Sequence, residues 1–239
     1  MISRLTRTTQ RLLFRTGTLT EKTMISPCML QLQIIGDSLK DLPWKPGQHI
    51  RLSLSKSSML LRTYTVRRYD ARQGSLDVWI MLHGQSPATA WANTINPGEE
   101  ISFLGPTGSF LLPEKESSSY LFVGEETAAV TIQTMLEALS ATARVMGCLE
   151  TRQPSEEIPG NSPHQLPWIY RNGAPAHSSP VLLAAVRSLK LPSTPGIAYL
   201  AGEARTCQAI RHYLRSELNW PRTAIHTKAY WTPGKKGLD

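Results

Sequence analysis

The chain has 239 residues, of which 41% are hydrophobic and 18% charged, a composition typical of a folded globular protein and not of a disordered one. Its net charge of +8 favours anionic ligands. Nucleic acid is not expected among them, because the cationic residues are scattered and no known nucleic-acid-binding motif is present. No apolar run approaches the roughly 18 residues of a membrane helix, so no membrane span is expected.

The N-terminal segment and the cysteines bear on localisation. Four arginines precede the first acidic residue, loosely as in a mitochondrial targeting segment: Arg4, Arg7, Arg11 and Arg15. Residues 12–14 continue into an expected strand without a visible cleavage boundary, so no removed segment is expected. The three cysteines stand far apart and form no CxxC pair: Cys28, Cys148 and Cys207. This usage fits a reducing compartment, and we expect a cytoplasmic protein.

The first half of the chain has the pattern of an antiparallel β domain. A first strand is expected just after residues 12–14. Further short segments of strand-like sequence occur at 29–35, 49–54, 63–69, 76–82 and 100–104. Turns rich in Gly and Pro separate them, which predicts a small barrel or sandwich.

The second half alternates between strands and helices. A polar linker at 113–119 precedes it. Strands are expected at 120–123, 143–149, 166–170, 197–201 and 224–231, and helices at 126–139, 180–189 and 207–218. This alternation predicts a parallel α/β sheet. The expected domains are therefore residues 1–113 and 114–239.

The segment Arg62–Arg68, RTYTVRR, combines strand-forming residues with three guanidinium groups. Alternation of side chains along a strand places Arg62, Tyr64, Val66 and Arg68 on one face. A flat anionic ligand could stack on Tyr64 and pair with Arg62, because a guanidinium can donate two hydrogen bonds to a phosphate. A charged, solvated edge strand is the alternative interpretation.

The segment 83–92, HGQSPATAWA, follows an expected strand and has the signals of a helix start. Ser86 is a good N-cap and Pro87 suits the first helical position. The amides of such a start attract phosphate, although the segment could equally be a plain capped helix with Trp91 in the core. No second histidine stands at ligand spacing from His83, so a structural role is favoured there, and no metal site is expected.

Two turns of the second half follow strands directly, at Gly124–Ala129 and Ala201–Arg205. Ligands of open α/β sheets bind at the carboxyl ends of the strands. Neither a GxGxxG nor a GxxxxGK[ST] motif is present. Each turn alone is a weak signal for a nucleotide site.

Six segments match one family in order: RTYTVR at 62–67, HGQSPATAWA at 83–92, GPTG at 105–108, GEETA at 124–128, AGEA at 201–204 and AYW at 229–231. Together they resemble the siderophore-interacting protein family, whose members are flavin-dependent ferric-siderophore reductases related to the ferredoxin reductases. The resemblance implies a six-stranded antiparallel Greek-key FAD-binding barrel followed by a parallel-sheet α/β domain that binds NAD(P)H.

The resemblance also implies contacts with each cofactor, and flavin chemistry without an acid–base residue of the protein. Arg62 would pair with the FAD pyrophosphate, Tyr64 would stack on the isoalloxazine, and Thr65 would lie near its N5 edge. The other implied FAD residues are Arg67, His83, Gly84, Pro87, Ala88, Trp91, Thr107 and Gly108. The residues expected on the NAD(P)H side are Thr127, Ala128, Arg152, Gly202, Glu203, Arg205 and Trp231.

The chain departs from the family pattern where a basic pocket for the siderophore is expected. Members often carry arginine at the positions of Thr107 and Thr232. Substitute cations for an anionic chelate are expected at Arg51, Lys56, Lys235 and Lys236. NADPH is favoured slightly over NADH, because Arg152 or Arg205 could meet a 2′-phosphate.

The expected reaction passes a hydride from NADPH or NADH to FAD and then single electrons to Fe(III), which releases Fe(II) from a ferric siderophore. A ferredoxin-like protein is a further candidate donor, and a monomer is expected. One alternative is a related flavin or ferredoxin-type reductase that delivers electrons to a protein or to free flavin. The other is a non-enzymatic basic module that binds siderophore, haem or nucleic acid.

Overall fold

The computed structural model describes residues 14–55 and 58–235. The chain divides into two compact units between Ser109 and Phe110. This division precedes the boundary predicted at residue 113. The ring of Phe110 packs edge-on against Tyr199, with centroids 5.3 Å apart, and the Tyr199 hydroxyl donates to the Leu111 carbonyl at 2.8 Å. These contacts hold residues 110 and 111 in the second unit.

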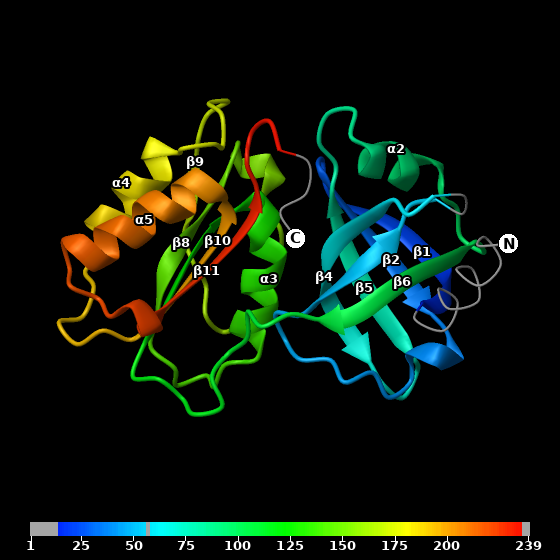
Figure 1. Ribbon diagram of the computed structural model, residues 1–239, viewed down its shortest axis with the longest axis horizontal. Coiled ribbons are helices and arrows are strands. Elements are labelled where there is room, and N and C mark those ends of the chain that lie inside the picture. The colour runs from blue at the N-terminus through cyan, green and yellow to red at the C-terminus, as the bar shows by residue number, and fades with distance from the viewer. Residues whose placement is uncertain (1–13, 56–57, 236–239) are drawn as a thin grey trace, which may run out of the picture. The chain divides into compact units, whose positions relative to one another are not determined.

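Within the described residues, six antiparallel strands close into a barrel in the order β1-β2-β5-β4-β3-β6 (Figure 1). This Greek-key order confirms the predicted barrel. The strands are β1 (Arg15–Ser26), β2 (Met29–Ile35), β3 (His49–Ser53), β4 (Leu61–Asp70), β5 (Ser75–Met81) and β6 (Glu100–Thr107).

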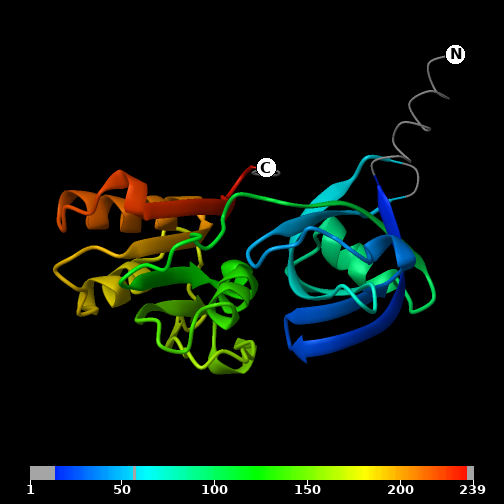
Figure 2. The ribbon, with the colours of Figure 1, turned by 90° about the horizontal axis from the view of Figure 1, so that it is seen from below.

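One end of the barrel is covered by helix α2 (Pro87–Thr94), as Figures 1 and 2 both show. Ser86 is its N-cap, accepting a hydrogen bond from the Thr89 N–H at 3.1 Å, and Pro87 is its first residue, which confirms the predicted helix start. Ala88 and Ala92 are buried in the barrel core, which is otherwise built from the inward-facing residues of the strands and the short 3₁₀ turn Asp37–Leu39. Small residues therefore let the helix lie close over the barrel.

Strand β4 contains a bulge at Arg67. Val66 pairs with Val78 of β5, whereas Arg68 pairs with the adjacent Asp77, so one extra residue lies between them. A bulge shifts the alternation of side chains by one position. Tyr69 therefore packs on the core and Arg68 is exposed, and the prediction that Arg68 shares a face with Tyr64 is wrong.

The second unit is a parallel sheet in the order β11-β10-β7-β8-β9, as predicted. Its three central strands are almost wholly buried, because helices cover both faces, whereas the edge strands are mostly half-buried. The strands are β7 (Tyr120–Glu125), β8 (Val145–Thr151), β9 (Trp168–Tyr170), β10 (Ile197–Glu203) and β11 (Ile225–Trp231).

Helix α3 (Glu126–Glu137) lies on one face of this sheet, and α4 (Pro180–Ser188) and α5 (Ala204–Ser216) lie on the other (Figure 1). The α4 and α5 face packs on aliphatic residues of the strands. The alternating residues on the opposite face include an aromatic stack, in which Phe122 lies between Tyr120 and Tyr199. Short 3₁₀ turns occur at Pro154–Glu156 and Arg222–Ala224.

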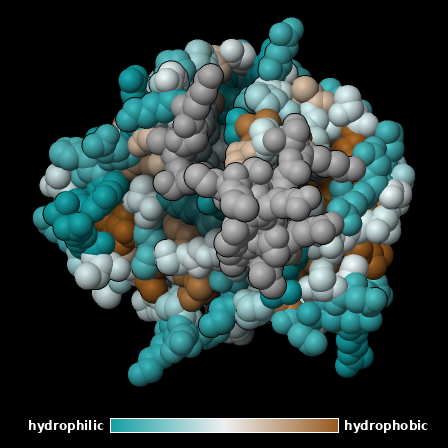
Figure 3. All heavy atoms as spheres, turned by 45° about the vertical axis from the view of Figure 1, so that its right-hand side comes forward, coloured by the Kyte–Doolittle hydropathy of each residue, from teal (hydrophilic) through white to brown (hydrophobic). Residues whose placement is uncertain are grey.

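The visible surface is largely hydrophilic. On the face shown in Figure 3, the hydrophobic residues that can be seen form separate small groups among hydrophilic ones. In residues 14–55 and 58–235, no helix combines the length and the apolar character needed to cross a bilayer.

Gly147 of β8 lies where the backbone of β7 approaches most closely. Its φ is +138°, and a Cβ there would lie 1.8 Å from the Phe122 carbonyl oxygen. We expect Gly147→Ala to lower the free energy of unfolding by about 3 kcal/mol or more, because the clash is with backbone that cannot move aside. Urea unfolding followed by circular dichroism measures this loss.

Gly173 offers a matched control for this substitution. Its φ is also positive, at +88°, but no atom lies within 4 Å of a Cβ built there. Gly173→Ala should therefore cost only about 1 kcal/mol, for the unfavourable backbone conformation alone. Equal losses in the two variants would contradict the close approach of β7 and β8.

Candidate functional site

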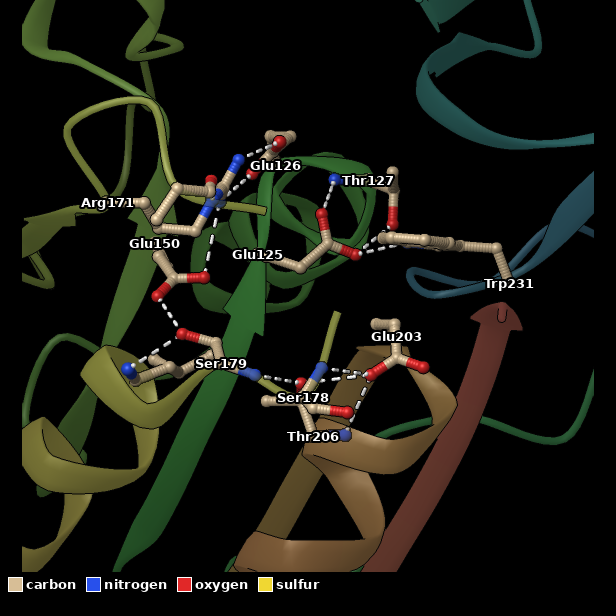
Figure 4. Close-up of polar contacts among 12 residues, drawn as sticks. Glu125, Glu126, Thr127, Glu150, Arg171, Ser178, Ser179, Glu203, Thr206 and Trp231 are labelled. Carbon is tan, nitrogen blue, oxygen red and sulfur yellow. Dashed lines mark hydrogen bonds and ion pairs between the residues drawn. The ribbon is translucent and has the colours of Figure 1, made fainter. Parts of the chain in front are cut away.

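The carboxyl ends of the parallel strands carry buried glutamates (Figure 4). Glu125 ends β7, Glu150 lies next to the end of β8, and Glu203 ends β10. Each is at most 1% exposed. Open α/β sheets bind ligands at this edge, so the partners of these carboxylates decide what the edge can bind.

Glu203 caps the N-terminus of α5. It accepts hydrogen bonds from the backbone N–H groups of Ser178 at 2.9 Å, Arg205 at 3.1 Å and Thr206 at 2.9 Å. The Thr232 hydroxyl also donates to it, at 3.2 Å. Burial opposes the ionisation of this carboxyl, but the donated hydrogen bonds outweigh burial and lower its pKa to about 2. Glu203 is therefore an ionised helix cap.

Glu125 caps α3 and joins β7 to β11. It accepts from the Thr127 N–H at 2.8 Å and from the Trp231 indole N–H at 3.0 Å. Burial, together with the neighbouring charge of Glu126, raises its pKa to about 7, and these hydrogen bonds offset only part of that rise. Gly202 lies against it with a φ of +125°, and a Cβ at this position would lie only 2.6 Å from Glu125 Oε1. Only glycine fits beside this carboxyl.

A buried ion network joins the ends of β8 and β9 to two helices. Arg171 donates to both oxygens of Glu126, each at 2.6 Å, and to Glu150 at 3.2 Å. The Ser179 hydroxyl donates to Glu150 at 2.5 Å and accepts from the Leu182 N–H at 3.1 Å, which caps α4. The N-termini of α3, α4 and α5 are thus all capped by side chains of the chain itself.

The residues predicted on the NAD(P)H side lie at or beside this edge. Ala128 is buried, and the Thr127 hydroxyl donates to Glu125 at 2.5 Å. The guanidinium-bearing Arg152 and Arg205 are exposed. The edge therefore offers two exposed cations beside carboxylates that already have internal partners.

The buried network was missed by sequence reasoning. Glu150, Arg171 and Ser179 come from three separate segments, and no motif links them. Their positions could have indicated them, because each lies at or directly beyond the end of a strand, or at the start of a helix. Among the described residues, no group of three His, Cys, Asp or Glu side chains could hold a metal ion.

In the barrel, the register of β3 and β4 decides which candidate residues share a face. Tyr64 lies opposite Ile50 and Arg62 opposite Leu52, so Arg62 and Tyr64 share one face of β4, as predicted. That face is the core side of the strand. Both are half-buried, and Arg62 Nη1 donates to the Leu61 carbonyl at 2.8 Å. Burial raises the pKa of Tyr64 to about 12, against the opposing charge of Arg62. This phenol therefore stays neutral.

Thr65 and Thr107 lie on the two strands that flank β3. His49 of β3 lies opposite Thr65 of β4 on one side and opposite Thr107 of β6 on the other. Gly105 lets β6 approach, because its φ is +104° and a Cβ there would lie 3.1 Å from the His49 carbonyl oxygen. Two motifs far apart in sequence are thus brought to neighbouring strands. Gly108, a further predicted FAD residue, directly follows Thr107. His49 itself was missed, because a single histidine in a strand has no motif.

The predicted cofactor residues at α2 lie near its N-terminus. His83 and Gly84 are exposed in the turn that precedes it, and the His83 N–H donates to the Thr89 hydroxyl at 3.2 Å. Pro87 is exposed at the first helical position, and Trp91 packs against the barrel core. This outcome fits both interpretations of the segment, since the helix is capped and its start is also accessible.

Arg67 and the predicted substrate residues lie in different surroundings. Arg67 is 2% exposed, with its guanidinium carbon 5.0 Å from the centre of the Trp79 ring. This burial does not favour a direct contact with FAD, which stays a prediction. Arg51 is half-buried on the outer face of β3, and Lys235 is exposed. Lys56, Lys236 and the N-terminal arginines Arg4, Arg7 and Arg11 lie outside the described residues.

The residues of the barrel fit a flavin dinucleotide. A half-buried neutral phenol and a half-buried guanidinium share one face of β4, whereas Thr65 of β4 and Thr107 of β6 lie on the opposite face, on either side of His49. A ring and a cation on one face are the partners that a planar anionic ligand requires.

The fold and these residues define a two-unit flavoprotein class, and family models agree. A model of the siderophore-interacting FAD-binding domain matches residues 55–110, and the model of the siderophore-interacting protein matches residues 117–234. The two matches together span more than half of the chain. The chain belongs to the siderophore-interacting protein family.

Particular relatives extend this assignment. The ferric vibriobactin reductase ViuB of Vibrio cholerae is 30% identical over 179 residues. That alignment covers 73% of this chain and 65% of ViuB, so the chain spans less than two thirds of its length. A siderophore utilization protein from T. fusca has a TM-score of 0.83 at 25% identity, with 95% of each chain covered. The ferredoxin-NADP+ reductase of Plasmodium falciparum shares the fold, with a TM-score of 0.77 at 13% identity over 90% of this chain and 95% of that one.

The raised pKa of Glu125 predicts a pH dependence of stability. The native state holds the Glu125 proton up to about pH 7, whereas the unfolded state releases it near 4.5. The native state therefore binds more protons in this window, and its extra stability is complete below pH 4.5 and lost as the pH rises through 7. In the unaltered protein, this group lowers the free energy of unfolding as the pH rises from 4.5 to 8. In Glu125→Gln, that decrease should be smaller by on the order of 1–3 kcal/mol, as urea unfolding at each pH measures.

Glu203 is the matched control because its pKa is shifted in the opposite direction. Its contribution is present above about pH 4.5 and is lost as the pH falls toward 2. Glu203→Gln should therefore change the dependence of the free energy of unfolding on pH only below pH 4.5. An unchanged slope between pH 4.5 and 8 in Glu125→Gln would show that Glu125 is ionised throughout this range.

Proposed function

We propose that this protein is an FAD-dependent oxidoreductase that takes electrons from NAD(P)H and reduces a ferric siderophore, releasing Fe(II) for iron assimilation. The observation that carries the proposal is the arrangement around β3 and β4. The residues of two distant family motifs, Thr65 and Thr107, lie on either side of His49 next to the Arg62 and Tyr64 pair. The similarity to a ferric vibriobactin reductase supports the substrate class.

In this proposal, β4 binds the flavin. Arg62 pairs with the pyrophosphate, Tyr64 stacks on the isoalloxazine, and Thr65 lies at the N5 edge. The raised pKa keeps the Tyr64 ring neutral, so it presents an apolar surface to the flavin. The remaining FAD contacts come from Thr107, Gly108 and the exposed turn at His83 and Gly84. Arg67 stays a predicted FAD residue, and its burial does not favour this contact.

The chemistry requires binding and orientation from the chain rather than an acid or base. Bound FAD supplies acceptance of a hydride and release of single electrons. Hard oxygen donors of a siderophore hold Fe(III) far more tightly than Fe(II), so reduction loosens the iron. The net charge of +8 attracts an anionic chelate, for which we propose Arg51, Lys56, Lys235 and Lys236 as contacts.

The electron donor in this proposal is NADPH or NADH, bound at the carboxyl ends of the parallel strands. Arg152 and Arg205 are exposed there and suit a phosphate of the dinucleotide. The three helix N-termini of this edge already hold internal capping groups, which leaves the phosphates to side chains and exposed loops. We also propose that the protein acts as a monomer in the cytoplasm.

One observation favours a second candidate, a reductase that passes electrons to a ferredoxin-like protein or to free flavin. Two positions that often carry arginine in the family hold Thr107 and Thr232 here, and Thr232 donates its hydrogen bond to Glu203. Neither position contributes positive charge for an anionic chelate.

Reoxidation of the reduced flavin separates these candidates. The purified protein should be yellow, and after anaerobic reduction its flavin should be reoxidised within seconds by a ferric tris-catecholate or a ferric hydroxamate. Ferredoxin and free flavin should react much more slowly. Stopped-flow absorbance in the flavin bands measures each rate. Reoxidation by ferredoxin or free flavin but by no ferric chelate would reject the siderophore substrate.

Arg62→Ala should weaken FAD binding at least tenfold, because a charge-assisted hydrogen bond contributes roughly 1.5–3 kcal/mol. Fluorescence titration of the apoprotein with FAD measures the dissociation constant. Arg68→Ala is the matched control, since Arg68 is exposed beyond the bulge. Full flavin occupancy in Arg62→Ala would refute the assignment of Arg62.

A further inference from the structure

Glu125 lies where the strand order of the parallel sheet reverses. From β7 the chain continues through α3 to β8 on one side, whereas β10 lies on the other side of β7. The helices that follow β7 and β10, which are α3 and α5, cover opposite faces of the sheet (Figure 1). In open α/β sheets such a reversal leaves a crevice at the carboxyl ends of the strands, and this crevice is the usual place for a ligand.

Two carboxyl groups flank this place. Glu125 ends β7 and Glu203 ends β10, and each caps the helix that follows it. Figure 4 shows the carboxyl group of Glu125 in contact with Thr127 and Trp231. Backbone N–H groups at a helix start would otherwise attract a phosphate, and here carboxyl oxygens already accept from them.

The same edge holds a polar group that lacks a partner. Thr151 ends β8 and is completely buried, and its hydroxyl makes no hydrogen bond within the part of the chain that the structure describes. Leaving a buried hydroxyl unpaired costs free energy. A polar ligand bound at this edge can supply the partner.

We propose that Glu125 is a specificity-determining residue for the electron donor, because its ionised carboxyl group repels dinucleotide phosphates from this crevice and its protonated form admits them. The inference rests on the proposed function, in which NAD(P)H binds at this edge. NAD(P)H carries a negatively charged pyrophosphate. A hydride donor without phosphates is therefore unaffected by the charge of Glu125.

The contacts of Glu125 allow both states of its carboxyl group. Hydrogen bonds from the Thr127 N–H at 2.8 Å and the Trp231 indole at 3.0 Å favour the ionised form. Burial and the charge of Glu126 favour the protonated form and raise the pKa to about 7. Glu203 stays ionised, since its pKa is lowered to about 2. The charge of the crevice therefore changes at Glu125 near neutral pH.

The other titratable groups packed around Glu125 are paired or neutral. Glu126 is bonded through both oxygens to Arg171. Glu150 lies directly opposite Glu125 on β8 and is also bonded to Arg171. Cys207 of α5 is uncharged, because burial raises the pKa of its thiol to about 12.

Two exposed groups at this edge also bear on phosphate binding. Arg205 lies at the start of α5, and a guanidinium keeps its charge throughout the range of interest. His177 directly precedes Ser178, whose N–H donates to Glu203 at 2.9 Å. Histidine loses its positive charge near neutral pH, which would also weaken phosphate binding. The test must therefore separate His177 from Glu125.

The test measures the binding of ADP-ribose, which carries the pyrophosphate but donates no hydride, to the holoprotein by isothermal titration calorimetry. In the unaltered protein, the dissociation constant should rise at least tenfold from pH 5.5 to 8.5, because ionised Glu125 repels the phosphates. Glu125→Gln should bind equally tightly at both ends of this range. His177→Gln is the matched control and should keep the pH dependence of the unaltered protein.

A comparison of two hydride donors keeps the test decisive if Glu125→Gln fails to fold. Stopped-flow reduction of the unaltered holoprotein should give an apparent dissociation constant that rises with pH for NADH. The constant for dihydronicotinamide riboside, which has no phosphate, should not change.

Three results overturn the inference. They are equal pH dependence for the two donors, persistence of the pH dependence in Glu125→Gln, and its loss in His177→Gln. Failure of both ADP-ribose and NADH to bind the unaltered protein at any pH rejects the dinucleotide donor of the proposed function instead.

Discussion

The α/β unit depends on the hydrogen bonds that its glutamates accept at the carboxyl ends of the strands. Each helix that follows a strand leaves backbone N–H groups without partners at its start. Glu125 and Glu203 accept these hydrogen bonds directly, and Ser179 does so while it donates to Glu150. Burying charges is costly, and Arg171 offsets part of this cost because it forms ion pairs with both Glu126 and Glu150. Strands, helices and loops are thereby joined in one polar layer.

The barrel is organised around β3, which lies between two strands that carry family motifs. Both of those strands are irregular. The bulge at Arg67 turns Tyr69 into the core, and the register shift near Gly105 places Thr107 opposite His49. Bulges commonly redirect side chains near functional sites. The regular register of β3 with β4 and the shifted register of β3 with β6 together bring two distant motifs to His49.

Much of this architecture was predictable, because Gly and Pro punctuate the strands and apolar periodicity distinguishes the two halves. The shared face of Arg62 and Tyr64 followed from strand alternation alone. The bulge at Arg67 did not, since nothing in RTYTVRR indicates which residue is unpaired. The partners of Arg171 are 21 and 45 residues away in sequence, so their contact depends on the sheet order. His49 gains its neighbours only through the register of three strands.

The contact between Glu125, Gly202 and Trp231 constrains how the chain can diverge. These residues lie at or next to the ends of three neighbouring strands, and the carboxyl group of Glu125 fills the space beside Gly202 while it accepts from the indole. A shorter side chain at position 125 would leave the indole N–H without its partner, and a larger one at 202 would displace the carboxyl group. Substitutions at these three positions are therefore tolerated mainly in combination, so they should covary among relatives.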